Sequence, residues 1–61
     1  MANITQMELN TLKQLIANED LTAKKFKLYA NNCSDPQLAG FFNECALTAA
    51  ANVRTLMSYL M

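Results

Sequence analysis

Apolar side chains recur along the chain at the three- and four-residue spacing of amphipathic helices, in two separate runs. The first run contains Leu9, Leu12, Leu15, Ile16, Ala23, Phe26, Tyr29 and Ala30. The second contains Leu38, Phe41, Phe42, Cys45, Ala49, Val53, Leu56, Tyr59 and Leu60, with Asn52 inside the same stripe. Each run predicts one helix with one apolar stripe. We expect helices over about residues 6–31 and 36–60.

The start of the first helix carries a specific signal. Thr5 and Glu8 have the T-x-x-E spacing of a capping box, in which each side chain accepts a hydrogen bond from an otherwise unpaired backbone N–H. Ile4 and Leu9 have the spacing of a hydrophobic staple across the same turn. The first helix should therefore begin near residue 6.

The stretch NNCSDPQL separates the two runs and predicts a turn over residues 32–35. Asparagine tolerates the left-handed conformation that often closes a helix. Ser34 or Asp35 can cap the second helix, and Ser34 with Gln37 has the spacing of a second capping box. Pro36 suits the first turn, where its missing N–H costs nothing.

Two long helices joined by a short turn indicate an all-α fold, an antiparallel helical hairpin in one domain over residues 1–61. A lone hairpin covers only part of each stripe and leaves large side chains half exposed: Phe26, Phe41, Phe42 and Leu56. A two-fold dimer that forms a four-helix bundle would cover them. Leu21 and Leu28 lie on the opposite side of the first helix, either as incidental exposed residues or as a lateral contact in a higher assembly.

Charge and length limit the function. The 61 residues carry five basic and five acidic side chains, so no net field attracts nucleic acid or an anionic membrane. The cluster KKFK at residues 24–27 fits a solvated outer face better than a phosphate site. The N-terminus lacks the features of a secretory signal, and no apolar run reaches the roughly 20 residues that span a bilayer. We expect a cytoplasmic protein.

Glu19 is the candidate for chemistry, because it places a carboxylate within the apolar stripe, where burial costs several kcal/mol unless the charge has a partner. The simplest partner is a hydrogen-bond donor such as Asn52, Tyr29 or a lysine. The alternatives are a buried polar pair that sets the register, or a metal site for iron or manganese. The candidate metal ligands are Glu19, Asn52 and Cys45, although Glu44 lacks the histidine three residues later that completes di-iron bundles.

Cys33 and Cys45 are too far apart along the hairpin for a disulfide, so both should be free thiols. The chain has no histidine to activate a thiol, so we expect no enzymatic activity and no cofactor. Cys45 suits a small core position, and Cys33 near the turn is a candidate for cross-linking to a partner. Gly40 is interpreted as a point of close packing at the start of the second helix.

Three sequence features together resemble the spore coat protein F-like family of short ferritin-like proteins from spore-forming bacteria. They are E-L-x-x-L at residues 8–12, E-D-L-x-x-K-K-F-x-x-Y-A at residues 19–30, and S-D-P-Q-L at residues 34–38 followed by two phenylalanines. The resemblance implies a hairpin that dimerises into a ferritin-like bundle, with a place in the spore coat or in sporulating cells. Where relatives often carry polar residues or histidine in the second helix, this chain has Ala49 and Asn52.

The leading hypothesis is therefore a non-catalytic structural or interaction protein that forms a homodimeric ferritin-like bundle. The alternative is a degenerate metal-binding bundle that uses Glu19. A third class is a module whose apolar stripe is covered by the helices of another protein.

Overall fold

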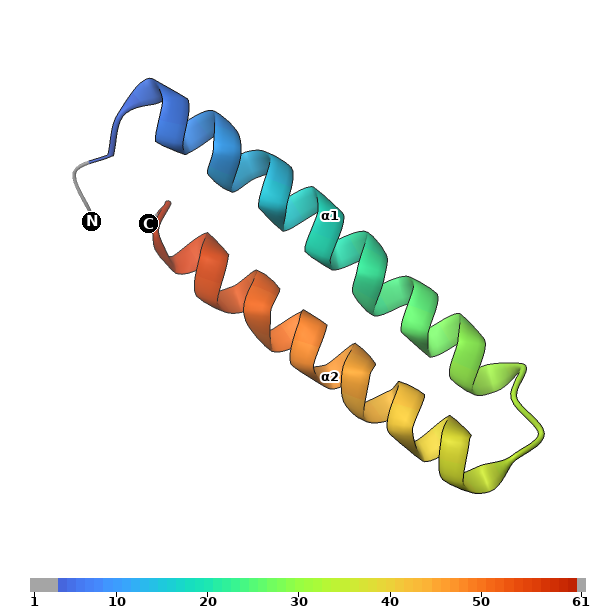
Figure 1. Ribbon diagram of the computed structural model, residues 1–61. Coiled ribbons are helices and arrows are strands. Elements are labelled where there is room, and N and C mark those ends of the chain that lie inside the picture. Colours follow the sequence, from blue (N-terminus) through green and yellow to red (C-terminus); the bar gives the residue numbers. More distant parts are fainter. Residues whose placement is uncertain (1–3, 61) are drawn as a thin grey trace.

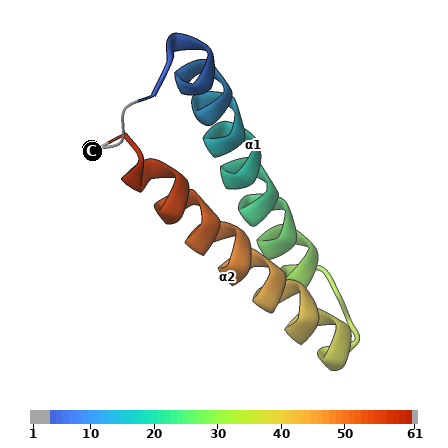
Figure 2. The same ribbon diagram turned by 60° about the vertical axis from the view of Figure 1, so that its left-hand side comes forward.

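The computed structural model describes residues 4–60, which form two antiparallel helices packed side by side as a hairpin (Figure 1). Helix α1 spans Gln6–Asn31 and helix α2 spans Pro36–Ser58. Both views place the start of α1 and the end of α2 at the same end of the hairpin (Figures 1 and 2). The molecule measures 45 × 15 × 11 Å, so it is about as thin as one pair of helices. The all-α hairpin expected from the sequence is confirmed.

The first turn of α1 has the predicted capping box. The Glu8 backbone N–H donates to Thr5 Oγ1 at 3.1 Å, and the Thr5 backbone N–H donates to Glu8 Oε1 at 2.9 Å. These bonds pair backbone donors that the helix itself leaves unpaired, which explains why α1 begins at Gln6.

The end of α1 differs from the left-handed cap that the asparagines suggested. The C-cap residue Asn32 has φ −103°, and no residue from 4 to 60 has positive φ. Instead, the Asn32 backbone N–H and its side-chain Nδ2 both donate to the carbonyl of Leu28, at 3.1 and 2.9 Å. These two bonds satisfy a terminal carbonyl without a left-handed residue, so a glycine is not required there.

Asp35, not Ser34, caps α2. The Asp35 carboxylate accepts from the backbone N–H groups of Gln37 and Leu38, at 2.9 and 3.4 Å, and Pro36 occupies the first helical position. The second capping-box spacing is therefore not used. At its other end α2 stops at Ser58, two residues before the predicted end, because the Tyr59 N–H bonds the Leu56 carbonyl, three residues back, as in the tighter last turn of many helices.

Small residues form the line of closest contact between the helices. Within residues 4–60 the buried hydrophobic side chains are Ala30, Ala46 and Ala49, which are 7%, 9% and 4% exposed. No large side chain of the described part is fully buried. Alanines allow two helices to approach closely, but they remove little apolar area from water. The hairpin by itself therefore has almost no hydrophobic core.

An aromatic cluster joins the helices near the turn. The ring of Phe26 lies 6.1 Å from Phe42 and 6.3 Å from Tyr29, centroid to centroid, and Tyr29 lies 6.0 Å from Phe42. Phe41 extends the cluster at 6.2 Å from Phe42 but remains 58% exposed. Edge and tilted geometries at these distances are favourable for aromatic rings. The cluster sets which turn of α1 faces which turn of α2.

Gly40 does not pack closely, contrary to the sequence interpretation. A Cβ added at Gly40 would meet no atom within 4 Å. The residue is exposed, and its helical position points away from α1, so the absence of a side chain serves no contact within the hairpin.

The two broad sides of the hairpin differ. We call the side that carries Leu15, Glu19, Thr22, Phe26, Phe41, Cys45, Asn52 and Leu56 the open face. We call the side that carries Ala23, Lys24, Lys27, Asn43, Ala46, Leu47 and Ala50 the back face. Neither described helix is sufficiently long and apolar to cross a membrane.

Candidate functional site

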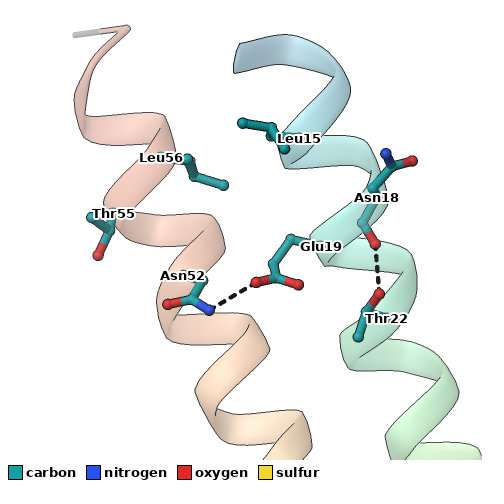
Figure 3. Close-up of a pocket in the computed structure, with 7 residues that line it drawn as sticks. All are labelled: Leu15, Asn18, Glu19, Thr22, Asn52, Thr55 and Leu56. Atoms are coloured by element: carbon teal, nitrogen blue, oxygen red, sulfur yellow. Dashed lines mark hydrogen bonds between the residues drawn. The ribbon is translucent and has the colours of Figure 1, made fainter. Parts of the chain in front are cut away.

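Glu19 lies at the middle of α1 and its carboxylate points toward α2 on the open face (Figure 3). The side chain of Asn52 on α2 donates a hydrogen bond from Nδ2 to Glu19 Oε2 at 2.7 Å. Such a bond to an ionised acceptor is short and stronger than a neutral one. Of the partners expected for Glu19, the structure selects Asn52, and the bond joins the two helices of one chain.

The Glu19–Asn52 pair separates two hollows on the open face, each of about 350 Å³. Both hollows are lined by Glu19, Thr22 and Asn52. The first continues toward the chain termini along Leu15 and Leu56. The second continues toward the turn, and both are open to solvent. The pair thus lies at the centre of a groove whose lining mixes apolar side chains with polar ones, among them Thr22, Thr48 and Thr55.

The structure brings all three candidate metal ligands together. Cys45 is half-buried and lines the second hollow with Glu19 and Asn52. Within residues 4–60, however, no three His, Cys, Asp or Glu side chains are grouped as metal ligands are. The three candidate ligands of one chain are thus a carboxylate, an amide and a thiol, a mixed set that suits neither a hard nor a soft ion well.

Thr22 belongs to the site and was not singled out from the sequence. It follows Glu19 by three residues, so the helical period alone could have placed it on the same side. Its hydroxyl donates to the backbone carbonyl of Asn18 at 2.9 Å (Figure 3). Because this hydroxyl proton is already used, Glu19 receives no hydrogen bond from Thr22.

The charges of the back face are paired differently. Lys24 Nζ lies 2.9 Å from Asp20 Oδ2, an exposed pair one helical turn apart. Lys27 Nζ donates to Asn43 Oδ1 at 3.3 Å and thereby joins α1 to α2. Within the described chain no cation lies within ion-pair distance of Glu19, so its interhelical partner is an amide alone.

Both thiols are free, as predicted. Cys33 is half-buried beside the turn, and its Sγ–H donates to the backbone carbonyl of Asp35 at 3.6 Å. Cys45 faces the groove. The two thiols therefore occupy different parts of the hairpin and have different neighbours.

Comparison of the chain with known protein families, with curated proteins and with solved structures found no match.

Proposed function

We propose that the protein is a non-catalytic structural or interaction protein whose working form is a homodimer, in which two hairpins pack through their open faces as a ferritin-like four-helix bundle. The observation that carries the proposal is the near absence of a core: three alanines are the buried hydrophobic residues of the described hairpin. The apolar side chains of the open face need a cover, and a second copy supplies one of matching length and shape.

The exposed area supports this reading. The chain exposes 4714 Å². A monomeric protein of its mass, 6.8 kDa, exposes roughly 3,950 Å² by the usual size scaling. The excess of about 760 Å² is close to the roughly 800 Å² that each partner buries in a stable interface of standard size. One interface thus accounts for the excess.

Native mass spectrometry combined with sedimentation tests the proposal on a matched pair of variants. Phe41→Glu places a charge on the open face, and Leu47→Glu places the same charge on the back face, at side chains that are 58% and 70% exposed in the hairpin. We expect a dimer for the native chain, at least about thirtyfold weaker dimerisation for Phe41→Glu, and no change for Leu47→Glu. Equal effects of the two variants, or a stable native monomer, would refute it.

The shared hollow of Glu19, Asn52 and Cys45 supports a second candidate, a metal-binding bundle for iron or manganese. In a dimer these ligands would be present twice. The same mass spectra, recorded under reducing conditions without chelator, test this candidate. Bound metal that is lost in Glu19→Ala would support this candidate. A metal-free dimer whose melting temperature does not change when iron or manganese is added would contradict it.

An association with the spore coat is proposed on the sequence resemblance alone. Its test is immunodetection of the protein in fractionated spores and vegetative cells of its own source. Enrichment in the coat fraction is the expected result. A uniform distribution in growing cells would leave the structural role without that location.

A native chain that is monomeric and partly unfolded until a second protein is added would favour the partner-binding module instead.

A further inference from the structure

The charges that border the open face favour one arrangement of the dimer. Apart from Glu8 and Asp35, which cap the helix starts, the described residues place one charge on each border. Glu44 borders the second hollow from α2. Lys25 follows Thr22 by three residues and precedes Tyr29 by four, so it lies on the corresponding border of α1. One border of the groove is therefore positive and the other negative.

These two charges lie at the same level along the hairpin. Phe26 is beside Phe42, and Lys27 is bonded to Asn43. In an antiparallel pair, one residue back along α1 corresponds to one residue forward along α2, so the first contact sets Lys25 opposite residue 43 and the second sets it opposite residue 45. Glu44, between the two, is therefore about level with Lys25. Within one chain they do not form an ion pair, because the groove separates them. Each remains available to a charge on another molecule.

Resting on the proposed homodimer, we infer that the two-fold axis runs parallel to the helices, so that α1 of each chain packs against α2 of its partner and both turns lie at one end. A half-turn about that axis keeps every residue at its own level along the hairpin. It places the positive border of one chain opposite the negative border of the other. Lys25 then meets the partner's Glu44 at both edges of the interface. The chain is thus complementary to a second copy of itself in charge as well as in apolar area.

The same rotation completes the polar site. It brings Asn52 of the partner to the level of Glu19, and Glu19 Oε1 has no hydrogen bond within residues 4–60. Each carboxylate then accepts from two amides in one layer of the bundle. A two-fold axis perpendicular to the helices, in a dimer whose helices overlap along their full length, would instead set the two Glu19 carboxylates against each other near the middle of α1. Repulsion between like charges disfavours that packing.

Carbodiimide cross-linking of the native chain tests the arrangement, since this reagent joins a lysine amine directly to a carboxylate in contact. Mixing unlabelled and nitrogen-15-labelled protein identifies links between chains by mass. We expect a covalent dimer in which Lys25 is joined to Glu44 of the other copy. A dimer whose interchain links omit this pair would overturn the arrangement while leaving the homodimer standing.

Charge exchange provides the second measurement. Lys25→Glu alone and Glu44→Lys alone create two like-charged contacts per dimer, and each should weaken dimerisation about tenfold. The double variant restores opposite charges and should return the dissociation constant to within about threefold of the native value. Lys13→Glu, the same charge change away from the open face, is the matched control and should have no effect. Harmless single variants would overturn the inference, and a chain that never dimerises would overturn both it and the proposed function.

Discussion

The open face and the back face of this hairpin are built on the same two helices, yet they differ in what they leave unsatisfied. The back face carries lysines that already have partners, Lys24 with Asp20 and Lys27 with Asn43. The open face carries aromatic and aliphatic side chains around one hydrogen-bonded carboxylate, Glu19. The contrast is one of side-chain size and polarity: the open face exposes large rings and aliphatic side chains around a polar pair, whereas the back face surrounds a hollow of about 500 Å³ with alanines, Leu47 and the two partnered lysines.

Removing an aromatic ring from the open face should destabilise the protein most. Phe26→Ala should lower the free energy of unfolding by about 3 kcal/mol, because Phe26 joins the rings of both helices and a cavity would remain. Leu47→Ala on the back face should change it by less than about 0.5 kcal/mol, since that side chain is largely in solvent. Urea unfolding at one fixed protein concentration measures both, and comparable losses would remove the distinction between the faces.

A smaller effect is expected for the bond at the centre of the open face. In a double-mutant cycle of Glu19→Ala and Asn52→Ala, the coupling free energy should be about 1 kcal/mol, because the hydrogen bond is charge-assisted but partly hydrated. Thermal unfolding of the four proteins provides the values. Thr22 serves as the control: a Thr22→Ala and Asn52→Ala cycle should show no coupling, since the Thr22 hydroxyl bonds only the backbone.

Gly40 provides a test on the side of α2 that points away from α1, where a side chain would meet no other atom. Gly40→Ala should raise the free energy of unfolding by about 0.5–1 kcal/mol, because alanine favours the helix and the added methyl group meets open space. Calorimetry of the two proteins provides the measurement. A destabilised variant would contradict this prediction, because it would mean that the added methyl group meets another atom in solution.

The smallest effect concerns pH and lies at the start of α1, away from both hollows. Hydrogen bonds from the backbone N–H of Thr5 and with its side chain lower the pKa of the Glu8 carboxyl below its ordinary value. A lowered pKa in the folded state means that this stabilisation is present above the ordinary glutamate pKa, about 4.3, and is lost as the pH falls through the lowered value.

Fraying of the first turn of α1 should therefore begin only as the pH falls below the ordinary glutamate pKa toward the lowered value. Amide hydrogen exchange at Glu8 measures this fraying. Glu8→Gln is the control, because glutamine keeps the capping geometry and does not titrate. Identical pH profiles for the two proteins would exclude Glu8 as the cause.

Much of the candidate site was accessible from the sequence. The helical period placed Glu19, Cys45 and Asn52 on facing stripes, and the structure brings them to one hollow. Thr22 was accessible by the same period and was missed because a threonine in a helix raises no question of burial. The choice of Asn52 over Tyr29 as the partner of Glu19 was not accessible, since it depends on which turns of the two helices lie level.

The local features of this protein could be worked out from its sequence: two helices, the capping box of Thr5 and Glu8, and the short turn that makes the helices a hairpin. These follow from hydrogen bonds and side-chain contacts between residues three or four apart, which neighbouring residues specify. The bond between Glu19 and Asn52 and the open space beside Gly40 are visible only in the folded chain. Those outcomes depend on the rotation and register of one helix against the other, which the packing of the alanines and the aromatic cluster sets across the whole length of the hairpin.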